Sequence, residues 1–492
     1  MIFFWLGACG VFGTSGDGAP PAKPGPPADP PPNEVPTGVF VRASKPDPAA
    51  DGTAEHPFST LAQALEKAGK RAVIACAEEY TEPITLRDGT SMYGFYDCTT
   101  IPWKRVDRRA RITSARSPVV TAEGLKEDTR VSGFDIVAPD FSGREASVGG
   151  AWTDESSVAA VVADSPKLVI ANGSLVARAG AAGVRGRRKP VWGESGADDV
   201  GATTGTGQGT HASAGAPGSG GKKYCVDGSG LLTGVGGAGG PGVEGDQIAA
   251  SGKAGGGGGG GAGGVGASGP APKHDGQAGK QPPRQRDGAA GKVRLTRDGP
   301  VRGDGEAGVD GLAGAGGGGG GGETGCHIDV PTGSQPCSLA PGTIPAGGGG
   351  GGAGGCPGRA SSGGVGGGSS IALYVRAGSL KLDGVKLEAG PGGTGGEAED
   401  PLPPTEGQAG AAGGCAGPTN PPLFKCPAGY ANAGVGGAGS RGGEAGRSGP
   451  GAPGVAVGIV SAPGVNVVTE GCSFGFAGTV PGGTATQRAT LE

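Results

Sequence analysis

The chain has 492 residues, a formal net charge of −4 and 115 glycines, about three times the usual share of glycine. Aromatic residues make up only 4% of the chain, and the basic residues are scattered, which argues against a nucleic-acid-binding surface. Because glycine contributes no side chain to a core, only about half of the chain is expected to fold around one.

The first twelve residues (MIFFWLGACGVF) are almost wholly apolar. Within them, Leu6-Gly7-Ala8-Cys9 fits the bacterial lipoprotein pattern, in which small residues precede a cysteine. The chain is cleaved directly before this cysteine, and the cysteine is acylated. Residues 1–9 are therefore predicted to be a lipoprotein-type signal, with Cys9 lipidated and the protein anchored in the cell envelope. The apolar run is short and no Lys or Arg precedes it, so the alternative is an apolar N-terminus that contains a cysteine by coincidence. No stretch reaches the roughly 18 apolar residues that a transmembrane helix needs.

Residues 10–36 are rich in Gly, Ala and Pro. Such a segment buries too little apolar surface to fold, and its prolines keep it extended. After a lipidated Cys9 it would be a tether that holds the folded part off the membrane, which makes the membrane a predicted partner. Without lipidation it would be a disordered terminus.

Folding is expected to start at Val39, where Val39 and Val41 alternate as in a strand. A helix is predicted over Pro57–Gly69, because Ser59 or Thr60 can cap its start and Gly69 can end it. Its apolar face would consist of Leu61, Ala64, Leu65 and Ala68. Strand-like segments follow at Ala72–Ala77, Pro83–Cys98, Arg111–Ala115, Pro118–Ala122 and Thr129–Pro139. The helix would cover the N-terminal end of these stacked strands, which otherwise exposes unpaired backbone and core.

Three later segments look like copies of one another: Ser156–Gly180, Ser369–Gly390 and Val455–Phe474. Each contains three short alternating apolar runs separated by turns of small residues. Period-two alternation indicates strands with one buried face. A unit of roughly 20–25 residues with three such strands is typical of one rung of a parallel β-helix, whose rungs bury their apolar face only by stacking.

The start of the folded part also resembles a known superfamily. The motifs concerned are Phe40-Val41, Gly52-Thr53, Pro57-Phe58-Ser59-Thr60-Leu61, Val73-Ile74 and Gly89-Thr90-Ser91-Met92-Tyr93-Gly94. They resemble the opening of the pectate-lyase-like superfamily of right-handed parallel β-helix proteins, specifically its DUF1565-like bacterial surface proteins. The resemblance extends from Val39 to Pro139 and to the three rungs. It implies an all-β fold, a right-handed parallel β-helix with a short N-terminal capping helix and long glycine-rich low-complexity insertions.

Two glycine-rich insertions interrupt the rungs. Their Gly-Gly-x tracts resemble in composition those of PE-PGRS-like repeat proteins, although no PE domain opens this chain, and they lack the strict Gly-X-Y period of collagen. Two states are open: disordered loops, or packed polyglycine-type helices with backbone hydrogen bonds between neighbours. Because glycine loses more entropy on ordering than any other residue, disorder or partial order is favoured.

The predicted organisation is thus a signal, a tether, three parts of a β-helix separated by two insertions, and a tail. In chain order their bounds are 1–9 (signal), 10–36 (tether), 37–180 (N-terminal β-helix part with the capping helix), 181–368 (insertion), 369–391 (rung), 392–454 (insertion), 455–480 (C-terminal rung) and 481–492 (tail).

Ten cysteines and an envelope location favour disulfides. The predicted pairs are Cys76–Cys98, Cys326–Cys337 and Cys415–Cys426. The first would bridge successive strands and close a loop of about 22 residues, worth on the order of 3 kcal/mol by chain entropy. The residues Cys225, Cys356 and Cys472 then stay unassigned. A metal site from Cys326, His327, Cys337 and Cys356 is the alternative, but its spacing matches no common zinc site.

No catalytic set is visible in the sequence. The superfamily that this chain resembles includes polysaccharide lyases and glycoside hydrolases, which cluster acids on one strand face as an acid/base pair or a Ca²⁺ site. Here the acids of the strand-like segments are isolated, and no two are expected to stack: Asp135, Asp164, Asp383, Glu388 and Glu470. The four histidines, His56 among them, lie in loops or low-complexity sequence, which argues against Ser–His chemistry. No catalytic residue, metal or cofactor is therefore assigned.

The expected function is that of a non-catalytic cell-envelope lipoprotein with a structural or adhesive surface. An extracellular polysaccharide is the partner that fold analogy alone suggests. Arg302-Gly303-Asp304 matches a three-residue adhesion motif, but chance explains the match at this glycine content. Two alternatives stay open: a polysaccharide lyase or glycoside hydrolase whose acids meet only in three dimensions, and an inert surface spacer.

Overall fold

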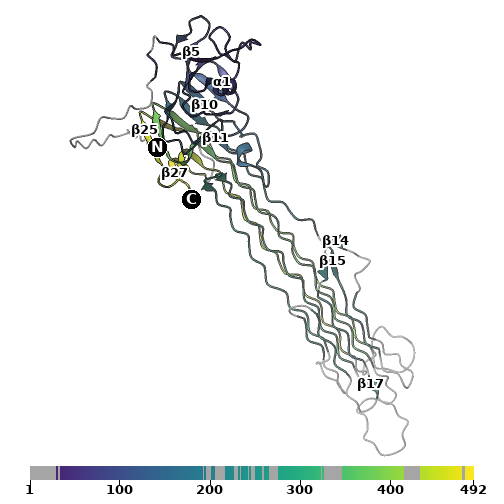
Figure 1. Ribbon diagram of the computed structural model, residues 1–492. Helices are drawn as coiled ribbons and strands as arrows, with labels where there is room; N and C mark the ends of the chain where they lie inside the picture. Colours follow the sequence, from purple (N-terminus) through teal and green to yellow (C-terminus); the bar gives the residue numbers. More distant parts are fainter. Residues whose placement is uncertain are drawn as a thin grey trace, which may run out of the picture.

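The computed structural model contains two regions of different architecture (Figure 1). The body consists of residues 34–180, 369–390 and 455–492 and is built from short strands. The bundle consists of the described glycine-rich segments within residues 181–368 and 391–454, which run side by side as a long, narrow projection. The structure describes residues 29–31, 34–191, 193–194, 201–205, 216–226, 231–232, 234–241, 243–244, 250–256, 260–264, 275–322, 324–325, 346–414, 433–478 and 483–492.

The body consists of three mainly parallel sheets, so the predicted all-β, parallel architecture is confirmed at this level. Sheet A contains β1 (Gly38–Val41), β2 (Ala72–Cys76), β5 (Met92–Asp97), β9 (Thr129–Ser132), β12 (Leu168–Ala171), β22 (Ser379–Asp383) and β25 (Asn466–Glu470), with β6 (Lys104–Arg105) antiparallel to β5. Sheet B contains β3 (Glu79–Thr81), β7 (Ala110–Thr113), β10 (Phe134–Val137), β13 (Ser174–Ala177), β23 (Lys386–Ala389) and β26 (Ser473–Phe476). Sheet C contains β4 (Ile84–Thr85), β8 (Val120–Glu123), β11 (Ser157–Ala163), β21 (Ser370–Ala377), β24 (Ala456–Ser461) and β27 (Ala485–Thr490).

The chain visits the three sheets in rotation. Strands β11, β12 and β13 lie in sheets C, A and B, and the same order repeats in β21–β23 and in β24–β26. Each strand pairs in parallel with the strand of the next round, so that Ala160 pairs with Leu373 and Leu373 with Ile459. Equivalent side chains therefore stack in columns, and the inward columns form one continuous apolar core.

Two of the three corners between the sheets are tight turns with a left-handed residue. At the corner from sheet C to sheet A these residues are Gly124, Asp164, Gly378 and Gly464; at the corner from A to B they are Gly133, Asn172, Gly384 and Gly471. A positive φ is easiest for glycine and tolerable for Asn and Asp. This requirement explains the small-residue turns that recur in the rung sequences.

Helix α1 (Leu61–Ala68) packs against β1, β2 and β4, the first strands of sheets A and C. The Thr60 side chain accepts a hydrogen bond from the backbone N–H of Gln63, and the Glu82 carboxylate accepts from the N–H groups of Leu61 and Ala62 at 2.7 and 3.1 Å. These bonds satisfy the free N–H groups of the first helical turn. The predicted helix and its buried face of Leu61, Ala64, Leu65 and Ala68 are confirmed.

Both insertions leave the body at the third corner, between sheets B and C: the first lies between β13 and β21, and the second between β23 and β24. Their first residues are already hydrogen-bonded: Gly368 N–H donates to Ala181 O at 2.8 Å, Gly393 N–H to Gly368 O at 2.7 Å, and Gly454 N–H to Gly393 O at 2.8 Å. The stacking of the rungs therefore sets the register in which the bundle starts.

Residues 346–368 form the centre of the bundle and exchange backbone hydrogen bonds with six neighbouring segments. The bonds recur at every third residue. For example, the N–H groups of Gly349, Gly352 and Gly355 donate to Gly434, Gly437 and Ser440 at 2.8–3.0 Å. An extended helix with three residues per turn returns to the same direction at every third residue, so each segment presents three straight rows of groups. Short strands also lie in this region: β14 (Gly193–Glu194), β15 (Tyr224–Val226), β16 (Leu231–Leu232), β17 (Val243–Glu244) and β20 (Thr324–Gly325).

Glycine is required inside the bundle because the segments approach so closely. A Cβ on Gly352 would lie 2.0 Å from the carbonyl oxygen of Gln408, and one on Gly436 would lie 2.0 Å from that of Gly350. The favoured prediction of disorder is therefore wrong for the described glycine-rich residues, which adopt the packed polyglycine-type alternative. The entropy argument counted the cost of ordering glycine but not the dense backbone hydrogen bonding that only glycine permits.

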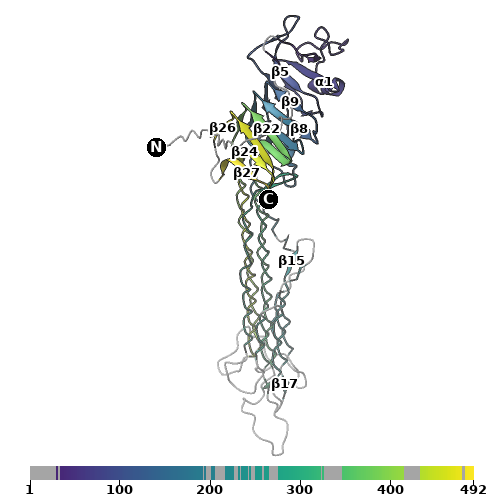
Figure 2. The same ribbon diagram turned by 60° about the vertical axis from the view of Figure 1, so that its left-hand side comes forward.

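A hairpin of the first insertion fixes the bundle to the body. Strands β18 (Arg294–Thr296) and β19 (Gly299–Val301) pair with each other, and the Tyr374 hydroxyl of sheet C donates to Thr296 O. Leu295 packs against the outward apolar residues of sheet C, which include Val158, Ile371 and Val457. The bundle thus continues directly from the body (Figure 2).

Ion pairs strengthen this junction and the sides of the bundle. The side chains of Arg302 and Glu155, both less than 10% exposed, form an ion pair of 2.5 Å beside the short 3₁₀ helix η1 (Trp152–Asp154). Exposed or partly exposed pairs connect neighbouring segments: Arg185–Glu397 at 2.7 Å, Arg188–Glu399 at 2.5 Å and Lys189–Asp310 at 2.8 Å. Each exposed pair contributes only about 0.2–1 kcal/mol, so their main effect is to select one register.

Candidate functional site

The outer face of sheet A carries a cluster of polar side chains around Asp29, a residue of the predicted tether. Arg130 Nε donates to Asp29 Oδ1 at 2.6 Å, while Ser132 Oγ and Asn172 Nδ2 donate to Oδ2 at 2.9 and 2.7 Å. Arg105 Nη2 lies 3.6 Å from the same Oδ2. We call Asp29, Arg105, Arg130, Ser132 and Asn172 the Asp29 site.

The fold explains how these donors converge. Arg130 and Ser132 are two residues apart in β9 and therefore project from the same face of the sheet. Asn172 is the left-handed corner residue after β12, the strand that pairs with β9. Arg105 comes from β6, beside β5.

The electrostatics favour an ionised carboxylate at this site. Burial raises the pKa of Asp29, but the hydrogen bonds from Arg130, Ser132 and Asn172 and the charge of Arg130 outweigh burial, so the pKa lies below its usual value. The side chains of Arg130 and Asp29 are 8% and 14% exposed. Charge-assisted hydrogen bonds of this kind are shorter and stronger than neutral ones. The arrangement is thus suited to hold a carboxylate group.

In this structure the carboxylate held is the protein's own, from Asp29 in the last part of the predicted tether over residues 10–36. Arg105 also donates to Pro30 O, and Val35 packs against the apolar cluster that contains Ile74 and Tyr93. Residues 29–31 and 34–36 therefore lie against sheet A. The prediction for this segment relied on its average composition, which does not single out Asp29 and Val35, the two side chains that make these contacts.

The acids of the rungs show a second difference from prediction. Asp383 and Glu470 are direct partners on β22 and β25, whereas no two acids were expected to stack. Arg130 Nη2 lies 3.6 Å from Asp383 Oδ2, and Lys381 Nζ lies 2.8 Å from Glu470 Oε2. Each of these two carboxylates is therefore engaged by a basic side chain. The other three acids are also paired, in Arg109–Asp135 (3.3 Å), Lys126–Asp164 (2.5 Å) and Lys386–Glu388 (2.8 Å).

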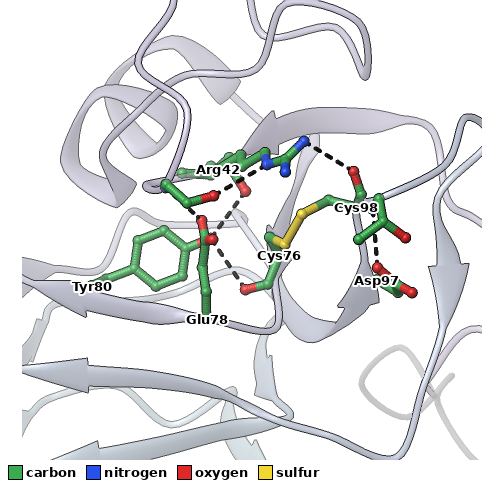
Figure 3. The surroundings of a disulfide bond; sticks show 9 residues. Arg42, Cys76, Glu78, Tyr80, Asp97 and Cys98 are labelled. Atoms are coloured by element: carbon green, nitrogen blue, oxygen red, sulfur yellow. Dashed lines mark hydrogen bonds between the residues drawn. A yellow bond between two sulfur atoms is a disulfide. The ribbon is translucent and has the colours of Figure 1, made fainter.

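Cys76 and Cys98 form a disulfide between β2 and the end of β5, the pairing that the sequence analysis predicted (Figure 3). Arg42 Nη1 donates to Cys98 O at 3.2 Å, and the Tyr80 hydroxyl donates to Cys76 O at 3.2 Å. Burial raises the pKa of Tyr80 well above its usual value, so its hydroxyl is a fixed donor. The Glu78 carboxylate lies beside both sulfur atoms, but metals bind thiolates rather than disulfide sulfurs. This cluster is structural.

A second disulfide joins Cys225 to Cys356, with 5.7 Å between the Cα atoms and a sequence separation of 131 residues. It connects the segment of β15 with the central segment of the bundle. The sequence analysis left both cysteines unassigned, because only the register of the bundle brings them together. The bond removes Cys356 from the alternative metal site.

Other predicted residues lie outside the described part of the chain: Cys9, Cys326, His327, Cys337, Cys415 and Cys426. His56 is in a loop, where its Nδ1 lies 2.7 Å from Asp47 Oδ2 and this contact raises the pKa of the imidazole. Arg302 of the three-residue adhesion motif is held by Glu155 and is not displayed.

The residues of the Asp29 site were not identified from the sequence. The alternation of Arg130 and Ser132 in a strand-like segment indicated an outward polar face, but nothing local connected it with a carboxylate about a hundred residues earlier.

Comparisons with protein families, with characterised proteins and with solved structures find no match to this chain. Within the described ranges, no helix has both the length and the apolar character to cross a membrane.

Proposed function

We propose that this protein is a non-catalytic, lipid-anchored protein of the cell envelope, and that its bundle acts as a rigid structural or adhesive projection. The observation that carries the proposal is the continuity of backbone hydrogen bonding from the stacked rungs into the bundle, at Gly368, Gly393 and Gly454. A projection without internal bonding would collapse into a coil. One with bonds at every third residue keeps its length.

We also propose that the body is a right-handed parallel β-helix whose three faces are sheets A, B and C. The rotation of successive strands through the three sheets and their parallel pairing support this assignment. The right hand is the one that connections between parallel strands overwhelmingly adopt.

The non-catalytic character is supported by the pairing of the rung acids with cations. The competing proposal, a polysaccharide lyase or glycoside hydrolase, is favoured by one observation, the adjacency of Asp383 and Glu470. An inert spacer is the third possibility, and one experiment separates all three. The full chain is incubated with soluble acidic and neutral polysaccharides, and both retention and new chain ends are measured. Retention of the protein on a polysaccharide without new polysaccharide chain ends is expected. New chain ends would establish the enzyme, and the absence of both signals would favour the spacer.

The anchor has its own test. In cells given a labelled fatty acid, the full chain should take up label and fractionate with membranes, and Cys9→Ser should lose both properties. Cys472→Ser, which removes a cysteine from the body, is the matched control and should keep both. If Cys9→Ser stays in the membrane fraction, the lipid-anchor proposal is wrong.

A further inference from the structure

A groove with a volume of about 430 Å³ runs along the outside of the bundle, between the segments of residues 275–291, 390–414 and 433–454. One wall contains Pro401, Leu402, Pro403 and Pro404, which follow one another in the middle segment. The other walls carry Arg284, Arg441 and Arg447 together with three carboxylates. We call this the bundle groove.

A row of backbone N–H groups runs along the 433–454 segment beside the groove, and the row's residues Arg441, Glu444 and Arg447 line the groove. Val435 N–H donates to Asp275 Oδ1 at 2.8 Å, and Arg447 N–H donates to Asp287 Oδ1 at 2.7 Å, so both point away from the bundle core toward the 275–291 segment. Because the segment repeats its direction every third residue, the N–H groups of Ala438, Arg441 and Glu444 point the same way. Within the described part of the chain these three have no hydrogen-bond acceptor. The two aspartate side chains show that this row of N–H groups donates hydrogen bonds to oxygen acceptors.

Ion pairs hold the groove's side chains in place. Arg447 Nε lies 3.1 Å from Asp400, Arg284 Nη2 lies 2.6 Å from Asp287, and Arg441 Nε lies 3.3 Å from Glu406. A guanidinium has five N–H donors, so each arginine keeps further donors available. Glu444 is exposed and offers an acceptor. The groove therefore presents donors and acceptors that are oriented before a ligand arrives.

The groove's lining selects among occupants. Another glycine-rich segment does not fit, because such segments approach so closely that a Cβ on Gly439 would lie 2.0 Å from Ala353 O, whereas the outward positions here carry long side chains. A polyanion gains no net attraction, because the three arginines are balanced by Asp287, Asp400 and Glu444. Hydroxyl groups both donate and accept. The wall of Pro401–Pro404, whose prolines lack N–H groups and whose Leu402 N–H is already bonded to Arg359 O, offers an apolar surface to the face of a sugar ring.

We propose that the bundle groove binds an uncharged, hydroxyl-rich polysaccharide chain lying along the bundle. The chain's oxygens accept hydrogen bonds from the N–H row and the guanidiniums, and its hydroxyls donate to Glu444. This proposal rests on the adhesive function proposed above and assigns it a site and a class of ligand.

The test uses the full chain and its retardation in native gels that contain a soluble neutral β-glucan, a neutral mannan or, as the acidic comparison, polygalacturonate. Arg441→Ala with Glu444→Ala removes one charge of each sign from the groove. Arg185→Ala with Glu397→Ala is the matched control, because it removes one exposed ion pair elsewhere on the bundle. We expect the groove variant to lose about tenfold in affinity for a neutral polymer, the loss of one or two hydrogen bonds. The control variant should bind as the original chain does.

Each other outcome overturns the proposal in a distinct way. Equal binding by both variants would remove the groove from the interaction while leaving the adhesive function intact. Preference for polygalacturonate, weakened by salt, would show that the ligand class is wrong. Absence of retention on every polymer would overturn the groove and the adhesive function together. Hydrogen exchange of the backbone in the 433–454 segment is measured in the groove variant. If it equals that of the original chain, a loss of binding is not caused by a loss of structure.

Discussion

The body and the bundle are held together by different parts of the polypeptide. In the body, apolar side chains such as Leu373 stack in columns inside three sheets. In the bundle, most interior positions are glycine, buried side chains such as Cys356 are few and mostly small, and the backbone itself supplies most of the contacts, as at Gly352. The hydrophobic effect therefore dominates the first region, and backbone hydrogen bonding with close van der Waals packing dominates the second. The comparison teaches that a chain with few apolar residues can still form an ordered, extended unit if its glycines repeat with the right period.

The largest expected difference between the two regions concerns their disulfides. The chain-entropy estimate for Cys225–Cys356, which closes 131 residues, is about 5 kcal/mol, against about 3 kcal/mol for Cys76–Cys98, which closes 22 residues. Replacing Cys225 and Cys356 by serine should therefore destabilise the bundle more than the same change at Cys76 and Cys98 destabilises the body. Hydrogen exchange of each region measures both effects. A bundle unaffected by the loss of its disulfide would mean that backbone bonding alone fixes its register.

A cavity in the body should act through lost apolar contact. Leu373 is completely buried, and Leu373→Ala should cost about 3 kcal/mol of the body's free energy of unfolding. Lys167→Ala, at a half-exposed position, is the control and should change stability by less than about 0.5 kcal/mol. Unfolding by denaturant, monitored by proteolytic cleavage within the body, measures the free energy of unfolding of both variants. A small effect at Leu373 would mean that the bundle, rather than the core, holds the body together.

One added methyl group in the bundle should act through the opposite mechanism. Gly352→Ala places a Cβ 2.0 Å from Gln408 O if nothing moves, and overpacking of this kind costs about 2 kcal/mol. Ala409→Val adds more volume at an outward, exposed position of the neighbouring segment and should be nearly neutral. Faster hydrogen exchange in residues 346–368 of the first variant alone is the expected result. Equal exchange in both variants would refute close packing.

The Asp29 site extends the comparison to the N-terminal segment, which is held by side-chain polar groups. Because the folded pKa of Asp29 lies below the unfolded value, its contribution is complete above the unfolded pKa, about 3.9, and is lost as pH falls through the lower folded pKa. Docking of residues 29–31 and 34–36 should therefore persist at pH 5 and weaken below about pH 4. Asp29→Asn should loosen it at every pH by about 1–2 kcal/mol. Protease cleavage within this segment measures docking, and a pH-independent cleavage rate in the original chain would count against the carboxylate's role.

Much of the fold could be predicted from local sequence patterns. Alternation in short runs and glycine at the corners identified the rungs, and capping residues identified α1, because each signal lies within one element. The pairing of Asp383 with Glu470 was missed because it depends on register between rungs that the second insertion separates. Cys225 and Cys356 were missed for the same reason, since their contact depends on three-residue periods counted along two distant segments. Asp29 was missed because one side chain within a low-complexity segment carries no pattern.

The three-residue period has a genetic consequence. Each turn of a bundle segment corresponds to nine bases of coding sequence and about 9 Å of length. The segments 346–368 and 390–414 run antiparallel, since Gln408, Ala411 and Gly414 donate to Ala353, Gly350 and Gly347. Deleting nine bases from each of two such neighbours, at matching heights, shortens them and leaves the remaining glycines facing the same way. Deleting three or six bases rotates the rest of a segment and turns outward residues such as Arg441 into the interior. Replication slippage within the glycine codons would therefore be tolerated in steps of nine bases. The length of the bundle can then change over generations while the body and its corners stay as they are.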